Sequence, residues 1–463
     1  MRMWTVSLVR CWSGGVSDKR AMSIRHTFCL KTSLVCLVTL ISMGAWATET
    51  RSLPVMPPAP SAERLSLEVV LEAARQHADV IAAARLEDAA RADVLVANRS
   101  PALALSSAVS TVDAKNGQAF GAALSPAKLN KSLGIDGLWE RGGKRALRTD
   151  KAQTMVQLAQ AERQETLVVQ QMAAQMAFYE LQTAQLRLEV LNDLAQGARL
   201  LAKTADTRLK NGDVSAQEAA RTQIEADRAH AEAQVALLEY QQSSLAIGTW
   251  TGLRRPMGGW SVQVQWPQDA AWVGLAAADI DKGPWLEARP DVVAARLRVT
   301  AANQAVALAQ ALRITDPSLG TSVENTPDGF GTTAKVMAFR IAIPLVHANR
   351  YDGEVARASA EAEASQSLLE RTRQRAQIEM LNWLETGQSQ AERLQIYEKD
   401  ILPNALRVAE QTETAYRKGG LSLTELLDAR RTLRAVQLDV LNARNAHAKA
   451  WTYWQRRMSS IAP

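Results

Sequence analysis

The chain has 463 residues, of which 47% are hydrophobic but only 5% aromatic, a composition that favours long, closely packed helices over one thick aromatic core. The net charge of +6 is concentrated in residues 1–47, which hold six Lys or Arg and one acid, so the remainder carries 48 basic and 47 acidic residues. This balance argues against nucleic-acid binding through bulk charge. All three cysteines also lie in 1–47, so we expect no disulfide and no cysteine metal site in the rest.

Residues 1–47 are predicted to be a secretory signal peptide, whose start could be Met22. Two basic residues precede an apolar run at 32–43, and Ala45-Trp46-Ala47 provides a small-x-small cleavage site. A membrane anchor is the alternative, although the apolar run is shorter than the roughly 20 residues that a spanning helix needs. Past residue 48 no uncharged apolar run reaches that length, so any entry into a membrane is expected to use β-strands.

The part of the chain after an extended segment at 48–65 is predicted to be an internal duplication. Asp79-Val80-Ile81-Ala82-Ala83 matches Asp291-Val292-Val293-Ala294-Ala295, and the small residues that follow stay in register. This self-similarity predicts repeat 1 at 66–252 and repeat 2 at 287–463. A linker rich in Gly, Pro and Trp, at 253–286, joins them.

Each repeat is predicted to contain a helix, two strands, one very long helix and a returning helix. In repeat 1 the strands fall at about 101–112 and 129–140, the long helix runs to about 210, and the return helix covers 215–250. In repeat 2 the strands fall at about 317–325 and 333–345, the long helix runs to about 418, and the return helix covers 422–458. Helices of this length reach about 100 Å and cannot be stable without partners along their whole length.

The predicted strands alternate between apolar and smaller or polar residues, as Met337, Phe339 and Ile341 do with the residues between them. Strands of about ten residues suit a tilted membrane strand. A small periplasmic sheet packed on the helices is the alternative. Lys131 and Lys335 fall on the apolar face, which disfavours lipid contact unless their side chains snorkel to the headgroups.

Two turns, 207 residues apart, end the long helices and start the returning ones. Each contains glycine, which permits a left-handed helix end, followed by Ser-x-x-Glu, which forms a capping box. The residues concerned are Gly212, Ser215 and Glu218 in repeat 1, and Gly419, Gly420, Ser422 and Glu425 in repeat 2.

This duplicated order of strand hairpin, long helix, Gly-x-x-Ser turn and returning helix resembles the TolC-like outer-membrane efflux family. The segments Ala415-Tyr416 and Leu426-Leu427-Asp428-Ala429-Arg430 are local marks of the resemblance. It implies a mainly α chain with a membrane β-barrel. The homotrimer would form an α-barrel in the periplasm and a shared 12-stranded β-barrel in outer-membrane lipid, with four strands per chain. It further implies a duct with no enzymatic activity and no cofactor, which works with a periplasmic adaptor (membrane fusion protein) and an inner-membrane RND transporter.

The segment Gly142-Gly143-Lys144-Arg145 resembles the heavy-metal (CzcC-like) branch of that family. It is predicted to lie at the junction of strand and long helix, where its cations would meet lipid phosphates or line the pore; a solvated helix start is the alternative. Metal cations are the expected substrate, with drugs or a secreted protein as alternatives. An alternative of a different functional class is a soluble periplasmic coiled-coil scaffold or adaptor.

The resemblance also assigns roles at the two turns. Glu425 and Asp428 would form an acidic constriction, and Tyr416 and Glu218 a hydrogen-bonded lock, while the arginine that usually adds to this lock is replaced by Leu421. The alternative is that Glu425 only caps Ser422 and Asp428 is solvated. The expected docking turns for the adaptor are Gly212, Ser215, Gly419, Gly420 and Ser422. The histidines show no metal-ligand spacing, so no metal site is predicted.

Overall fold

The computed structural model describes residues 63–110, 130–267, 285–327, 333–345 and 350–459, all of which lie within one compact unit, 59–463. The predicted signal peptide at 1–47, most of the predicted extended segment at 48–65 and half of the linker at 253–286 lie outside the described residues. Within the described ranges, none of the helices combines the length and the apolar content that crossing a membrane requires.

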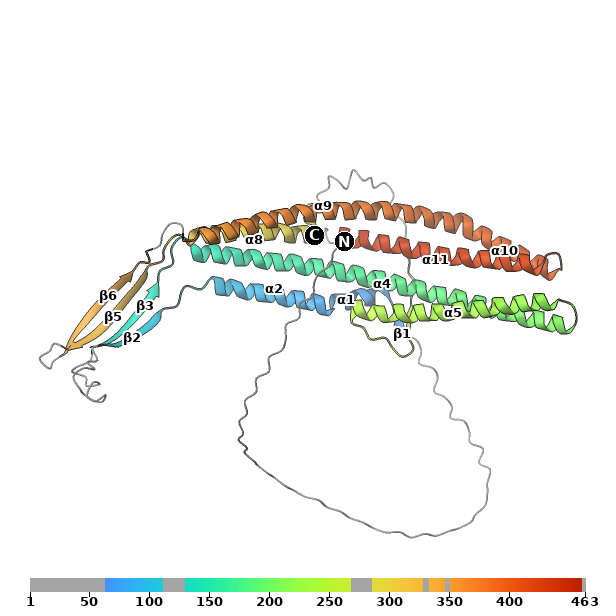
Figure 1. Ribbon diagram of the computed structural model, residues 1–463, viewed down its shortest axis with the longest axis horizontal. Helices are drawn as coiled ribbons and strands as arrows, with labels where there is room; N and C mark the ends of the chain where they lie inside the picture. Colours follow the sequence, from blue (N-terminus) through green and yellow to red (C-terminus); the bar gives the residue numbers. More distant parts are fainter. Residues whose placement is uncertain (1–62, 111–129, 268–284, 328–332, 346–349, 460–463) are drawn as a thin grey trace, which may run out of the picture. The chain divides into compact units, whose positions relative to one another are not determined.

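The unit is mainly helical, with long helices side by side, a small sheet at one end and two helical turns at the other (Figure 1). The helices are α1 (Leu67–Arg75), α2 (Ala78–Ala97), α4 (Lys144–Lys210), α5 (Ala216–Thr251), α7 (Trp285–Ala288), α8 (Pro290–Ala311), α9 (Asp352–Ile396), the π-helix η1 (Tyr397–Ile401), α10 (Leu402–Arg417) and α11 (Leu423–Ser459). With 67 residues, α4 is about 100 Å long.

Small residues allow these long helices to approach closely. Ala195 of α4 packs against Ala229, Ala233 and Ala236 of α5, and all four are buried. The two repeats use their helices alike, because α2 packs on α4 as α8 packs on α9. In addition, α8 contacts α4 and thereby joins the repeats. Long helices that are individually unstable are thus supported along their length by neighbours.

Larger side chains gather where the short elements cover the middle of the bundle. Phe178 and Leu181 of α4 are fully buried in one cluster with Trp260, and Tyr179 stacks on Trp266. In repeat 2, Trp383 stacks on Tyr453 with 4.7 Å between ring centres. Aromatic contacts therefore anchor the segment at 260–266 on α4 and hold α9 against α11.

The second long helix differs from the first in being interrupted by the π-helix η1. Pro403 follows this turn directly, at the start of α10. Proline lacks the N–H that would bond four residues back, and its ring collides with that carbonyl, so a wider turn relieves the conflict. The sequence prediction of one regular helix up to about 418 misses this irregularity.

The main sheet has four antiparallel strands in the order β2-β3-β5-β6. They are β2 (Ala104–Ser110), β3 (Asn130–Leu138), β5 (Ser318–Pro327) and β6 (Thr333–Ala342), and correspond to the four predicted strands. The outermost strands, β2 and β6, leave one row each of backbone groups without a partner strand among the described residues. A separate pair, β1 (Glu63–Leu65) and β4 (Trp260–Val262), is parallel.

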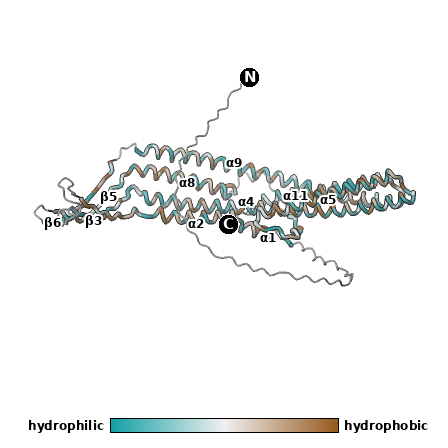
Figure 2. The backbone as a smooth tube through the Cα atoms, turned by 60° about the horizontal axis from the view of Figure 1, so that its bottom comes forward, coloured by the Kyte–Doolittle hydropathy of each residue, from teal (hydrophilic) through white to brown (hydrophobic). Residues whose placement is uncertain are grey.

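The register gives the main sheet one apolar face and one face of small and polar residues. Leu133 lies beside Val323, which lies beside Met337, and the next row includes Ile135 and Phe339. These side chains are 49–80% exposed, so nothing in the described unit covers them. Figure 2 shows hydrophobic residues in this end of the unit in brown.

Candidate functional site

The two helical turns share one backbone geometry. Gly212 and Gly419 have φ values of 81° and 76°, in the left-handed region where a side chain is strained. In both turns the next N–H donates to a carbonyl five residues earlier, at 2.9 Å. This is the Schellman arrangement, which satisfies carbonyls at the helix end and reverses the chain within a few residues.

The caps that start the returning helices differ between the repeats. In repeat 2 the N–H and Oγ–H of Ser422 both donate to Oε2 of Glu425, at 2.8 and 2.7 Å, and the N–H of Glu425 donates back to Oγ at 3.3 Å. In repeat 1 the N–H of Glu218 donates to Oγ of Ser215 at 3.1 Å, but its carboxylate forms no hydrogen bond within the described ranges. The bonds from Ser422 hold the pKa of Glu425 below its ordinary value.

Three of the four predicted gate residues, all except Glu425, line one cavity of about 670 Å³ between the two turns. Its lining includes Tyr416, Glu218 and Asp428, together with the cap residues Ser215 and Ser422. No hydrogen bond joins Tyr416 to Glu218 in the part of the chain that the structure describes, so the bond predicted for the lock is not formed here. Both side chains border the same cavity instead, and Nη1 of Arg221 donates across it to Oγ1 of Thr424 at 3.5 Å.

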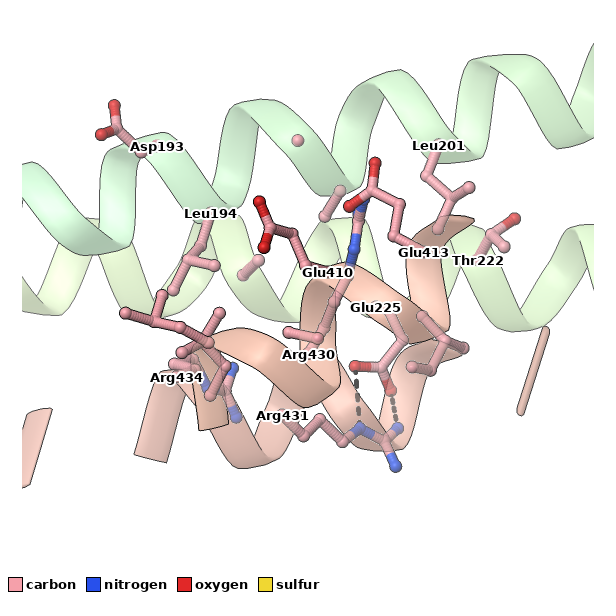
Figure 3. Close-up of a pocket in the computed structure, with 17 residues that line it drawn as sticks. Asp193, Leu194, Leu201, Thr222, Glu225, Glu410, Glu413, Arg430, Arg431 and Arg434 are labelled. Atoms are coloured by element: carbon pink, nitrogen blue, oxygen red, sulfur yellow. Dashed lines mark hydrogen bonds and ion pairs between the residues drawn. The ribbon is translucent and has the colours of Figure 1, made fainter. Parts of the chain in front are cut away.

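Ion pairs join the hairpin α4–α5 to the hairpin α10–α11, and we call the two nearest the turns the inter-hairpin clasp. In the first, the guanidinium of Arg431 on α11 binds both carboxylate oxygens of Glu225 on α5 (Figure 3). In the second, Nη1 of Arg434 donates to Oε2 of Glu232 at 2.7 Å. The hydrogen bond from Arg431 lowers the pKa of Glu225 against the opposing effect of burial.

Arg431 also lies beside the predicted acidic constriction. Its Nη1 is 3.5 Å from Oδ1 of Asp428, whose side chain is 65% exposed. Glu425 and Asp428 lie three residues apart on α11, close to the turn. In this structure Glu425 caps its helix, which is the alternative considered for it, and Asp428 is an exposed acid beside an arginine.

A second cavity, of about 500 Å³, separates the hairpins next to the clasp (Figure 3). Leucines from α4, α10 and α11 line it, and Glu413 lies at its edge. Burial raises the pKa of Glu413, but ionic hydrogen bonds from Arg430 (3.1 Å) and Arg417 (2.6 Å) outweigh this and lower it. These pairs hold α10 and α11 together beside the cavity, while the clasp joins the two hairpins next to it.

The predicted strand-to-helix junction has a structural role that the sequence prediction missed. Lys144 is 6% exposed, and its Nζ donates to Oδ2 of Asp316 at 2.7 Å and to the carbonyl of Ile314 at 2.6 Å. Both expectations for this lysine, contact with lipid or pore and a solvated helix start, are wrong. The buried pair fixes the start of α4 to the segment that precedes β5 in the other repeat.

The other members of the junction support the same connection. Gly142 and Gly143 have φ values of 72° and 68°, and a Cβ on Gly142 would lie 2.8 Å from Ile314. Arg145 remains exposed and donates to Asn98 and Ser100, at 3.0 Å each. The glycines therefore allow a close approach and a sharp turn in the backbone.

Among the residues that the structure describes, no group of three or more His, Cys, Asp or Glu is placed to hold a metal ion. His77 caps α2 by accepting from the N–H of Asp79, and His447 is buried.

Comparison with known proteins shows that the described unit shares its fold with solved outer-membrane channels. Residues 285–453 match the outer membrane efflux protein family. The Campylobacter jejuni CmeC outer membrane channel superposes with a TM-score of 0.70 at 16% identity, over 85% of each chain. The outer membrane protein VceC from Vibrio cholerae superposes with a TM-score of 0.66 at 19% identity, over 85% of this chain and 95% of VceC. The Neisseria gonorrhoeae MtrE outer membrane channel superposes with a TM-score of 0.66 at 16% identity, over 85% of this chain and 88% of MtrE.

No curated protein matches the chain. The solved channels establish the fold, and the family match covers α7 to most of α11. The chain therefore has the fold of these outer-membrane channels, and its residues 285–453 carry the sequence pattern of the outer membrane efflux protein family.

Proposed function

We propose that this protein is the outer-membrane exit duct of a tripartite efflux system. It would act as a homotrimer that conducts passively, with energy supplied by an inner-membrane RND transporter and with a periplasmic adaptor between the two. The fold and the family match support this reading over a soluble scaffold or adaptor. The observation that carries it is the uncovered apolar face of the main sheet.

The apolar face has the dimensions and borders of a lipid contact surface. Its exposed residues include Phe339 at 80% and Met337 at 65%, which a periplasmic sheet packed on the helices would have covered. Trp139 extends the ladder, because its N–H donates to the carbonyl of Pro317 at 2.9 Å, and it is 61% exposed on the same face. From Trp139 to Lys131 the strand spans about 26 Å. An outer-membrane strand presents an apolar band about 25 Å tall, with aromatic residues at its borders.

The two unpaired strand edges support the assembly of several copies. In lipid, each unsatisfied backbone N–H or C=O costs several kcal/mol, so β2 and β6 must find partner strands. The edge strands of neighbouring copies supply them if β6 of one copy pairs with β2 of the next. The number of three copies comes from the family resemblance.

The opposite end of the unit, with its two turns, would face the periplasm and the adaptor. We propose the turns at Gly212–Ser215 and Gly419–Ser422 as docking sites. Glu425 and Asp428 would form acidic rings at the entrance under threefold symmetry. Tyr416, Glu218 and the inter-hairpin clasp would hold this entrance closed.

Heavy-metal cations are the proposed substrate, with drugs or a secreted protein as alternatives. The supporting observations are the resemblance at Gly142–Arg145 and the carboxylates at the entrance, which attract cations. A deletion strain complemented with the gene tests this choice. Restored resistance to divalent metal salts with unchanged drug sensitivity supports metal export, and the reverse result rejects it.

Membrane fractionation with two matched variants tests the duct itself. The wild-type protein is expected in the outer membrane as a detergent-stable trimer that conducts ions in planar bilayers. Phe339→Arg, on the apolar face, should prevent insertion, because a cation in the middle of the apolar band costs about 2–4 kcal/mol per copy. Ala338→Arg, at the same depth on the other face, should insert. A soluble wild-type monomer, or equal behaviour of the two variants, contradicts the proposal.

A further inference from the structure

The apolar face of the main sheet ends in a polar row that the proposed duct does not by itself explain. Lys131 of β3, Asn325 of β5 and Lys335 of β6 are direct neighbours in the register. They lie on the same face as Leu133 and Met337, one row further from the helices. We propose that this row binds the phosphate of a lipid headgroup in the outer leaflet, an inference that rests on the proposed function.

The two lysines have no anionic partner within the sheet. Both are exposed, and neither forms an ion pair within the described ranges. The acids of the main sheet, Asp136 and Glu324, lie in register with residues of the opposite face. A cation at the border of an apolar surface is costly without a counter-charge, and the described residues supply none, so an anion at this border would stabilise the row.

The position of the row selects the source of that charge. Trp139 marks the border of the apolar face nearest the helices, and Lys131 lies about 26 Å further along the same strand. Because the helices extend from the Trp139 end toward the periplasm in the proposed duct, the lysine row lies at the outer border. Long lysine side chains at such a border reach the headgroup layer, where lipid phosphates are the available anions.

Asn325 gives a second, independent indication of a ligand. Its Oδ1 is buried and has no hydrogen-bond partner in the described part of the chain. An unpaired acceptor between two cationic donors suits a headgroup that carries a hydroxyl as well as a phosphate. Phosphatidylglycerol is a simple lipid of this kind.

The strand order gives the sites a regular spacing in the proposed assembly. One strand separates β3 from β6, so the two lysine positions are about 10 Å apart. If β6 pairs with β2 of the next copy, one strand also separates Lys335 from the next Lys131. A lysine then occurs on every second strand around the assembly, so the cationic row is continuous across the copies.

Lipid binding to the purified full-length protein in uncharged detergent tests the proposal. Phosphatidylglycerol and diacylglycerol with the same acyl chains are added in turn, and retained lipid is measured by native mass spectrometry together with the temperature at which the trimer dissociates. Phosphatidylglycerol should be retained and should raise this temperature, whereas diacylglycerol should not. Inorganic phosphate alone should have no effect; equal stabilisation by phosphate would overturn the assignment to a lipid.

Substitutions then assign the effect to the row. Lys131→Gln with Lys335→Gln should reduce retention of phosphatidylglycerol about tenfold, the loss expected for about 1.4 kcal/mol of binding free energy. The Arg pair should retain it, and Lys203→Gln, an exposed lysine on α4, should bind as the wild type does. Unchanged retention in the Gln pair refutes the site. Because the Gln pair should still assemble in the outer membrane, a wild-type protein absent from that membrane signals failure of the duct itself.

Discussion

Arg431 on α11 binds Glu225 on α5 and so joins the two helical hairpins close to their turns. The glutamate side chain is 16% exposed and the arginine 45%, so the pair is partly shielded from water. A cavity of about 500 Å³, lined by residues of both hairpins, lies beside it. The pair is therefore one of the contacts that would keep the proposed entrance closed.

Breaking this pair should open the channel. Glu225→Gln keeps the shape of the side chain but removes its charge, at a cost of about 1 kcal/mol for a partly exposed ion pair. We expect a higher single-channel conductance in planar bilayers. Asp206→Asn, which breaks the exposed pair with Lys210 on α4, is the control and should leave the conductance unchanged.

The same measurement separates the clasp from the lock suggested by the family resemblance. Tyr416→Phe with Glu218→Ala removes both lock residues without touching the clasp. If Glu225→Gln conducts as the wild type does and the lock variant opens, the clasp has no gating role. If only Glu225→Gln opens, the lock assignment is wrong for this chain.

Acid should open the channel through the same carboxylate. The pKa of Glu225 lies below its ordinary value of 4.5, because Arg431 stabilises the charged form. A lowered pKa means that the stabilisation is fully present above pH 4.5 and is lost as the pH falls through the pKa of the folded state. Wild-type conductance should therefore rise below about pH 4.5, and Glu225→Gln should lack this rise. A rise of equal size in both proteins would point to other acids.

A side chain at Gly419 should disrupt adaptor docking before it affects assembly. No heavy atom lies within 4 Å of a Cβ built there, so the penalty comes from the left-handed backbone, at about 1–2 kcal/mol. Gly419→Val should abolish cross-linking to the adaptor while the trimer persists. Gly353→Val on α9 lies outside both turns, meets no heavy atom within 4 Å and has no left-handed backbone, so it is the matched control. Normal cross-linking in Gly419→Val would exclude this turn as a docking site.

Lys144 should be essential for stability and Arg145 should not. Lys144→Met leaves Asp316 partly buried without its counter-charge, and breaking a buried pair from one side costs about 3 kcal/mol or more. We expect a clear fall in the temperature at which the trimer dissociates on heating. The double change Lys144→Met with Asp316→Leu should recover part of the loss, and Arg145→Gln should cause little. If Lys144→Met and Arg145→Gln lower this temperature equally, the buried pair does not have the stabilising role proposed for it.

Features that depend on nearby residues could be predicted from the sequence. The capping box of Ser422 and Glu425 acts within one helical turn, and the apolar alternation of Met337, Phe339 and Ile341 is visible within one strand. Pro403 also gives a local signal, a proline within a long helical pattern, which the prediction of one regular helix did not take up.

Features that join distant segments could not be predicted in the same way. Lys144 and Asp316 are 172 residues apart, and lysine is normally exposed, so its burial follows only from the fold. Arg431 meets Glu225 because of how each helix is rotated about its own axis. A signal for the clasp exists, since Glu225 and Glu232 are two turns apart on one face of α5. However, two acids on one helix face do not reveal which residues of another helix they will bind.

The open edges of the main sheet have a genetic consequence. If β6 of each copy pairs with β2 of the next, one copy with a defective edge strand leaves a gap in any ring that it joins. When defective and normal copies are made in equal amounts, only about one trimer in eight contains normal copies alone. Substitutions that spoil β2 or β6 but still permit assembly are therefore dominant over the wild-type allele, whereas changes that unfold the chain before assembly are recessive.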